Sequence, residues 1–304
     1  TEAEEASGTL GEIMSEIFNE VDGGKPIDKT LTGIPIVDEC TNGLAKGELV
    51  TIGAKSGKGK SALAIRMAVN MFKDGKKVLI VRREMSKKQI GERILLAHSG
   101  VTKENYEKRT LSETDWVRIV ETTEAFNTDQ IIIDDKIATI PEIKQAVRKH
   151  KPDMLIVDYV QLLTPTNPRD SRERQVADMS RELKKMTSDF DMIVVQLTQL
   201  AEKGIGNYRP HGESYPRESR AIYHDSNIVI YAHHVEEEKE IQIAYNSTAV
   251  KERMSLHQFE EMLKRFDDND TRLMELIVDK NRSGTVGSKF YWFSGPEMSY
   301  FPVL

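Results

Sequence analysis

Residues 53–61, near the start of the chain, restrict its fold more than any other stretch of the sequence. They read Gly-Ala-Lys-Ser-Gly-Lys-Gly-Lys-Ser, follow an apolar run at residues 49–52 and precede a helical pattern that begins near Ala62. The order of strand, glycine-rich turn and helix is that of a phosphate-binding P-loop. Ala54 stands where the motif usually has its first glycine, but a small side chain still permits a close turn. A chance glycine-lysine turn is the alternative, and the flanking pattern favours the P-loop.

The residue types in this loop predict its ligand. Backbone N–H groups of a glycine-rich turn, together with the N-terminus of the following helix, face an anion. Lys60 adds a point charge and Ser61 can ligate Mg²⁺. We therefore expect ATP or another nucleoside triphosphate as ligand, with Mg²⁺. The predicted phosphate-binding residues are Ser56, Gly57, Lys58, Gly59, Lys60 and Ser61.

The composition limits the class of protein and its partners. A chain of 304 residues that is 38% hydrophobic can bury a sizeable core, so we expect one large α/β domain with attachments. The single cysteine, Cys40, excludes an internal disulfide and indicates a reducing compartment. The chain has no secretory signal and no apolar run long enough for a bilayer, so we expect a cytoplasmic protein without membrane contact. The net charge of −6 means that any binding of nucleic acid must use a local patch.

The N-terminal segment carries a separate amphipathic pattern. Apolar residues recur at helical spacing from Leu10 to Val21, and Asp22-Gly23-Gly24 then ends the predicted helix. This apolar stripe either packs on its own domain or docks on a neighbouring subunit. We expect residues 1–28 to form a linker helix with its tether, and residues 29–304 to form the NTPase domain.

Strands and helices are expected to alternate around the P-loop. A turn-rich segment at residues 32–44 leads to the P-loop strand. Further strands are predicted at residues 77–81, 130–134, 154–158, 192–196, 227–231, 241–245, 274–278 and 289–293, the last of which should end the sheet. Helices are predicted at residues 87–98 and 113–126, from Pro141, and at 171–190 and 256–266. This alternation predicts a mostly parallel, twisted sheet flanked by helices, with ligand at the carboxyl ends of the strands.

Two carboxylates follow predicted buried strands. Asp158 ends four apolar residues, which is the Walker B pattern, and we expect it to join Ser61 in holding Mg²⁺. An aspartate after a strand is usually only a turn residue, but the presence of a P-loop favours the metal role. Glu84 follows the strand at residues 77–81 and is a candidate for orienting an attacking water.

Several motifs along the chain occur in an order that resembles one family. They are Thr32-Gly33-Ile34-Pro35, the P-loop, Glu84-Met85, Asp158-Tyr159-Val160-Gln161-Leu162, Leu197-Thr198-Gln199-Leu200, Arg217-Glu218-Ser219 and Lys280-Asn281-Arg282-Ser283-Gly284. Together they resemble the C-terminal motor domain of DnaB-type replicative helicases, which has a RecA-like fold. The resemblance runs from about residue 31 to the end and is weakest between residues 235 and 272, where this chain looks longer than the family pattern.

The resemblance implies roles for several residues in NTP hydrolysis. Glu84 would be the catalytic base, Lys60 would hold the phosphates, and Gln199 would sense the nucleotide state. Lys280 and Arg282 would reach the nucleotide of a neighbouring subunit as sensor and arginine finger.

The resemblance also implies a DNA-contacting loop. It would include Arg217 and Glu218, and Arg220, which stands where the family usually has glycine, would add a phosphate contact or merely solvate the loop. A second departure precedes Glu84, because Arg82 and Arg83 replace a small and an apolar residue and could pair with that glutamate.

The function implied is a ring-forming, ATP-dependent 5′–3′ DNA helicase that translocates on single-stranded DNA, most simply as a hexamer. The family's N-terminal domain, which carries primase contacts, is not in the sequence. A primase and a helicase loader would therefore act through a segment upstream. The missing initiator methionine is explained either by removal of that segment or by processing. Two alternatives stay open: a RecA/RadA-like recombination or repair ATPase, and a nucleotide-switched RecA-fold assembly protein for which DNA is irrelevant.

Overall fold

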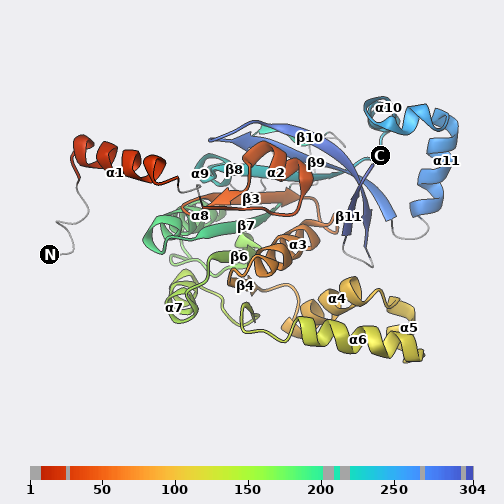
Figure 1. Ribbon diagram of the computed structural model, residues 1–304, viewed down its shortest axis with the longest axis horizontal. Coiled ribbons are helices and arrows are strands. Elements are labelled where there is room, and N and C mark those ends of the chain that lie inside the picture. Colours follow the sequence, from red (N-terminus) through yellow and green to blue (C-terminus); the bar gives the residue numbers. More distant parts are fainter. Residues whose placement is uncertain are drawn as a thin grey trace.

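A nine-stranded sheet runs through the centre of the computed structural model, which describes residues 8–24, 28–200, 209–212, 220–267, 271–295 and 299–303 (Figure 1). The order of the strands across the sheet is β11-β10-β9-β8-β3-β7-β6-β4-β5. The parallel strands are β3 (Leu49–Ala54), β4 (Val78–Arg82), β5 (Ile131–Asp134), β6 (Met154–Asp158), β7 (Ile193–Gln199) and β8 (Ile228–His234). The sheet predicted from the alternation of strands and helices is therefore confirmed.

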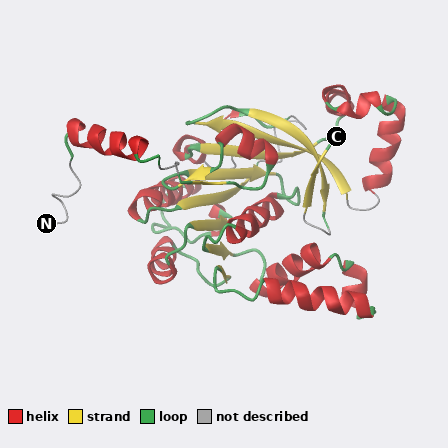
Figure 2. Cartoon of the chain, in the orientation of Figure 1, coloured by secondary structure: helices red, strands yellow, loops and turns green. Residues whose placement is uncertain are grey.

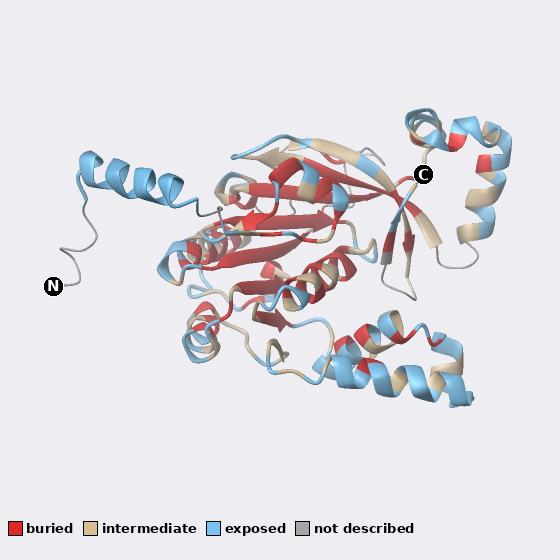
Figure 3. Ribbon diagram, in the orientation of Figure 1, coloured by how far each residue is buried: buried red, intermediate tan, exposed pale blue. Residues whose placement is uncertain are grey.

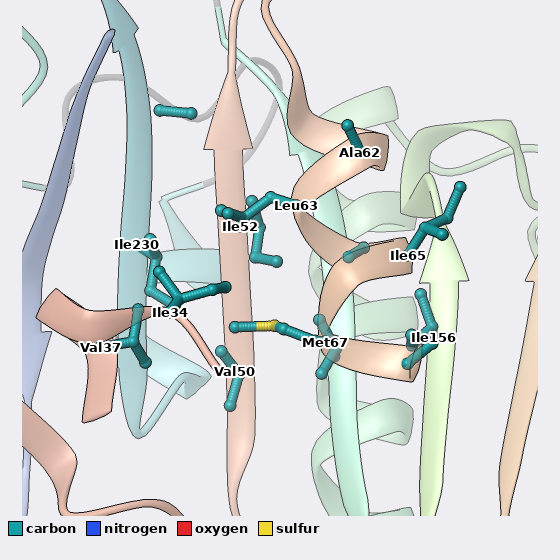
Figure 4. Packing of buried hydrophobic residues seen from close by; sticks show 14 of the residues in the cluster. Ile34, Val37, Val50, Ile52, Ala62, Leu63, Ile65, Met67, Ile156 and Ile230 are labelled. Atoms are coloured by element: carbon teal, nitrogen blue, oxygen red, sulfur yellow. The ribbon is translucent and has the colours of Figure 1, made fainter. Parts of the chain in front are cut away.

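Helices cover both faces of the parallel strands, which explains why those strands read as continuous apolar runs (Figure 2). The helices α2 (Pro35–Thr41) and α3 (Lys60–Lys73) pack on one face, and α7 (Ile140–His150) and α8 (Arg172–Asp189) pack on the other. All residues of β3 are buried, and alternate ones face alternate layers. Figure 4 shows Val50 and Ile52 of β3 between Leu63 and Met67 of α3 and Val37 of α2.

The end of the sheet beyond β8 is antiparallel and differs from the sequence prediction. β9 (Thr271–Asn281) pairs with β8, and β10 (Gly287–Ser294) pairs with β9. The prediction that residues 289–293 end the sheet is wrong, because β11 (Ser299–Pro302) pairs with β10 as the edge strand. This strand is short and ends in proline, a residue that sheets accept at an edge, so it lacks the apolar run by which the others were found.

Two other segments also differ from the prediction. The turn-rich segment expected at residues 32–44 contains α2, which starts with Pro35 and buries Ile36, Val37 and Cys40. The strand expected at residues 241–245 is helix α10 (Glu238–Ser247). Its residues Ala244 and Tyr245 pack, with Phe259 of α11 (Leu256–Asp267), in a small separate core beside β9.

The remaining elements lie around the sheet. They are β1 (Lys29–Thr30), β2 (Leu44–Ala45), α4 (Lys87–Ser99), α5 (Lys103–Lys108), α6 (Glu113–Ala125), α9 (Ala221–Asp225) and the 3₁₀ helices at Val160–Leu162 and Ala249–Glu252. The helices α4, α5 and α6 form one group and α10 and α11 another, both beyond the end of the sheet where α3 begins (Figure 1). None of the described helices is long and apolar enough to span a bilayer.

The N-terminal helix α1 (Leu10–Asp22) stands apart from this body (Figure 3). It begins with a capping box in which Thr9 and Glu12 satisfy each other's backbone N–H groups, so its start follows from local sequence. None of its residues is buried. The predicted helix is confirmed, and its apolar stripe has no cover within the described part of this chain.

Candidate nucleotide and metal site

The P-loop connects the carboxyl end of β3 to the N-terminus of α3. Gly57 and Gly59 have φ angles of +69° and +79°, in the left-handed region that glycine adopts without strain. Gly53 is glycine for another reason, because a Cβ there would lie 2.9 Å from the ring of Tyr231. Ala54 is fully buried in the strand, so alanine fits the position that the motif usually gives to glycine.

A cleft of about 550 Å³ opens at this loop, a size suited to a small ligand. Its walls include every predicted phosphate-binding residue, together with Glu84 and Gln199. Gln199 ends β7 and pairs with Ala54, which brings it beside the loop. The cleft is strongly cationic, since Arg82, Arg93 and Arg272 also line it. Such a wall is suited to a polyanion.

Lys60 lies at the bottom of the cleft and is only 8% exposed. Burial lowers the pKa of its ammonium, while the charges of Asp158 and Glu84 act in the opposite direction. The ammonium also lies 4.4 Å from the centre of the Tyr159 ring. The lysine therefore lies at the start of α3, where the helix dipole favours an anion, and its charge interacts with those of two carboxylates.

Ser61 and Asp158 form the candidate metal site. The Ser61 hydroxyl donates to Asp158 Oδ2 at 2.7 Å, although the two residues are far apart in sequence. Asp158 is 3% exposed, and its other oxygen, Oδ1, has no hydrogen-bond partner within the described part of the chain. Hard oxygen donors with a spare lone pair fit Mg²⁺ and its bound waters. The pair of residues predicted for the metal is thus brought together.

Glu84 lines the cleft, and the two arginines before it contact other residues. Arg82 Nε is 3.2 Å from Asp158 Oδ2. Arg83 points elsewhere and donates to the carbonyl oxygens of Asp135 at 3.4 Å and Lys136 at 3.1 Å. Among the described contacts neither guanidinium reaches Glu84, so the pairing considered from the sequence is wrong. The glutamate side chain is exposed to the cleft.

Lys280 and Arg282 lie at one end of the sheet's strands, and the P-loop of the same chain lies at the other end. β9 runs antiparallel to β8, so Lys280 pairs with Val229 near the start of β8. Its ammonium donates to the carbonyl oxygens of Tyr223 and His224 at 2.7 and 3.1 Å. Arg282 also donates to His224 at 2.7 Å. Neither cation lines the cleft.

The predicted DNA-contacting residues are only partly described. Arg217 and Glu218 lie outside the described residues. Arg220 is exposed and precedes α9, where its carbonyl oxygen accepts from the backbone N–H groups of Tyr223 and His224 at 3.1 and 3.2 Å. This places Arg220 at the same end of the sheet as Lys280, because that lysine contacts the same short helix.

Several residues of the site were not found from the sequence. Arg272, at the start of β9, donates to the Gly57 carbonyl oxygen at 3.4 Å. Lys58 donates to His234 and, at 2.8 Å, to Glu236, at the end of β8 and just beyond it. Consecutive P-loop residues are thus tied to both ends of the segment that contains α10 and α11. No motif marks these partners, and only the order of the strands brings them to the loop.

Tyr300 of β11 is a further missed residue. Its hydroxyl donates to the Gly59 carbonyl oxygen at 3.2 Å, and its ring packs on Phe293 with centroids 4.7 Å apart. Burial raises the pKa of the phenol, so the group stays a neutral donor. A side chain at Gly59 would collide with this hydroxyl, which gives that glycine a second reason beyond its backbone angle.

A P-loop at the carboxyl edge of a mainly parallel sheet, with an aspartate on a nearby strand beside the P-loop serine, defines a RecA-like P-loop NTPase domain. The chain belongs to the DnaB-like helicase C terminal domain family, whose model matches residues 30–301.

Relatives of the chain include replicative DNA helicases. The chain is 30% identical over 241 residues to the replicative DNA helicase DnaB of Leifsonia xyli, a match that covers 74% of this chain and 51% of the relative. It is 25% identical over 298 residues to that of Helicobacter pylori, covering 93% and 61%. The chain thus spans about half to three-fifths of the length of these relatives.

Solved structures resemble the chain over nearly its whole length. A solved ATPase domain superposes with a TM-score of 0.79 at 25% identity, covering 98% of this chain and 100% of that one. A DnaB-like replicative helicase, described with its interactions with primase, gives a TM-score of 0.75 at 25% identity, covering 97% and 67%.

Proposed function

We propose that this chain is the motor of a replicative DNA helicase, which hydrolyses ATP or another NTP to move along single-stranded DNA and separate a duplex. The observation that carries the proposal is the cleft lined by the P-loop and Glu84, with Asp158 bonded to the P-loop residue Ser61, in a chain of the DnaB-like family. The alternatives considered from the sequence would share such a cleft, and the match to the DnaB-like helicase family favours the helicase.

The residues of the cleft divide the work of hydrolysis. The P-loop N–H groups and Lys60 hold the phosphates, and Ser61 and Asp158 would hold Mg²⁺. When bound, Mg²⁺ supplies positive charge to the phosphate oxygens. Glu84, exposed in the cleft, orients or deprotonates the attacking water. Gln199, which lies beside the loop at the end of β7, would sense the nucleotide state.

Hydrolysis at this site would need a second subunit. Arg282 and Lys280 lie at the edge of the sheet away from their own cleft, so any contact with nucleotide is to that of a neighbour. In that position Arg282 stabilises charge that develops during transfer. A head-to-tail contact between identical subunits closes into a ring when the rotation allows it, and we propose a hexamer.

Two apolar surfaces support assembly. The stripe on α1 is exposed along the helix, with Leu10 and Phe18 at 75% and 67% exposure. Trp116, Val117 and Val120 on α6 are also exposed. Exposed apolar patches of this kind mark interaction sites, and these two would cover each other between neighbouring subunits.

DNA and other proteins complete the proposed assembly. The loop that contains Arg217, Glu218 and Arg220 would line the central channel and bind the DNA backbone. The 5′–3′ direction of movement follows from the family resemblance alone. A primase and a loader are further proposed partners, and the solved DnaB-like helicase that interacts with primase supports the first of them.

The proposal is tested by unwinding of a forked duplex with one labelled strand. We expect strand release that depends on ATP and Mg²⁺ and is absent with Lys60→Ala. Release of a 5′-tailed but not a 3′-tailed substrate would establish the direction. ATP-dependent strand exchange without unwinding would instead identify a recombination ATPase, and hydrolysis indifferent to DNA would identify an assembly switch.

A further inference from the structure

An arginine contacts both residues of the candidate metal site. Arg82 is the last residue of β4 and pairs in register with Asp158 on the neighbouring strand β6. Its side chain is 3% exposed and still reaches the cleft wall. Its Nε atom lies 3.2 Å from Asp158 Oδ2, and its Nη2 atom donates to the Ser61 hydroxyl at 3.3 Å. The guanidinium therefore contacts both residues that would hold Mg²⁺.

This arginine brings a guanidinium into a buried position. A guanidinium is not deprotonated in proteins, so the fold must compensate a full positive charge at this point. Asp158 supplies the compensation, and the Ser61 hydroxyl links the two by accepting from Arg82 while it donates to the carboxylate. The Walker B carboxylate is thus already paired with a cation before any metal binds.

The charged groups around Arg82 determine how it affects nucleotide binding. The ammonium of Lys60 interacts with the charges of Asp158, Glu84 and Arg82. A triphosphate adds several negative charges to this group, in a cleft that Arg93 and Arg272 also line. Arg82 is a cation in direct contact with Asp158, one of the two residues that would hold a divalent ion.

We propose that Arg82 is a built-in counter-cation that performs part of the work of the divalent ion, so that nucleotide binds without metal and metal binds less tightly than the oxygen ligands alone would allow. The proposal rests on the proposed function, because it assumes that the cleft binds an NTP. Its physical basis is that like charges a few ångströms apart repel, while a cation beside the phosphates attracts them. The two effects have opposite signs.

A purely structural role for Arg82 makes a different prediction. If the arginine only neutralised the buried Asp158, its loss would leave an unpaired buried charge and disturb the whole site. Affinities for nucleotide and for metal would then fall together. Opposite changes in the two affinities are therefore the signature of the counter-cation.

The experiment measures two equilibria for each protein. The first is binding of a fluorescent ATP analogue in EDTA, and the second is binding of Mn²⁺, followed by its electron paramagnetic resonance signal, to protein saturated with a non-hydrolysable ATP analogue. The variants are Arg82→Gln, Arg82→Lys and, as matched control, Arg83→Gln, whose guanidinium contacts only backbone carbonyls of Asp135 and Lys136 among the described residues. Thermal unfolding checks that each variant is folded.

We expect Arg82→Gln to weaken metal-free nucleotide binding by about tenfold and to tighten Mn²⁺ binding by about tenfold, the scale of one charge interaction at a partly screened site. Arg82→Lys places an ammonium at the same position and should change both affinities less than Arg82→Gln does, while Arg83→Gln should stay within about threefold of wild type in both. Parallel losses of both affinities in Arg82→Gln, or no change in either, would overturn the proposal.

The wild-type protein gives a test that does not depend on folding of a variant. We expect its nucleotide affinity in EDTA to stay within about a hundredfold of that in Mg²⁺, and loss of all binding in EDTA would overturn the role of Arg82. If Mg²⁺-dependent hydrolysis persists while that binding is lost, the proposed function stands and only this inference falls. If no nucleotide binds under any condition, both fall.

Discussion

Glu84 is the residue that should separate chemistry from binding. Its carboxylate is exposed in the cleft and is contacted by neither Arg82 nor Arg83, while the phosphates are held by other groups. Glu84→Gln should therefore bind ATP as wild type does and hydrolyse it at least about a hundredfold more slowly, the scale of lost base catalysis. Steady-state turnover and equilibrium nucleotide binding measure the two effects separately.

Glu92→Gln is the matched control, because Glu92 lines the same cleft from α4 but accepts from the hydroxyl of Tyr106. Its turnover should stay close to that of wild type. Turnover near normal in Glu84→Gln would move the role of base elsewhere, with Asp158 and Gln199 next in line.

At the scale of single residues, the sequence could predict those that belong to a contiguous motif or that directly follow an apolar strand. The P-loop is one contiguous motif, and Asp158 and Glu84 follow apolar runs on strands that a parallel sheet brings to one edge. Arg272 and Tyr300 reach the P-loop from antiparallel strands more than two hundred residues away. Their contacts depend on which strands are neighbours, and no local pattern contains that information.

Helix α1 is the element that we expect to make contact between subunits. Its apolar stripe is exposed, and covering it would contribute about 25 cal/mol for each Å² removed from water. Removal of residues 1–24 should therefore produce smaller species in sedimentation, with a parallel loss of ATPase. Glu16→Gln with Glu20→Gln, on the same helix but outside the apolar stripe, should leave assembly intact. An unchanged assembly after the deletion would show that the helix makes no contact between subunits.

The error at α10 shows where sequence patterns fail for elements. Residues 241–245 contain Ile241, Ile243 and Tyr245, an alternation typical of a strand. In the helix Ile243 is 60% exposed, while Ala244 is buried in the small core beside β9. Five residues are too few to distinguish the two-residue period of a strand from the 3.6-residue period of a helix. The longer patterns of α3 and α8 were predicted correctly.

For the whole molecule, the acidic net charge opposes DNA binding, so the cations that bind DNA must form a local patch. A loop with Arg217 and Arg220, repeated around a ring, would give a cationic channel in a chain whose net charge is −6. Arg217→Ala with Arg220→Ala should lower the affinity for all single-stranded sequences alike and flatten the slope of log K against log salt. Fluorescence anisotropy at several salt concentrations measures both. Unaltered affinity would move the DNA-binding surface to the cations of residues 164–174.

The most direct test of the account is a mixing experiment, because its central claim is that one subunit's P-loop works with the Arg282 of the next. Arg282 lies at the end of the strands opposite to its own cleft. Lys60→Ala and Arg282→Ala subunits would therefore damage different halves of a site shared between neighbours. In an equal mixture about a quarter of the interfaces would join an intact P-loop to an intact arginine. We predict that DNA-stimulated ATPase, absent in either parent, returns in the mixture. It should stay absent when Lys60→Ala is mixed with the double variant, which leaves no P-loop intact. A mixture of the single variants as inactive as its parents would contradict the shared site.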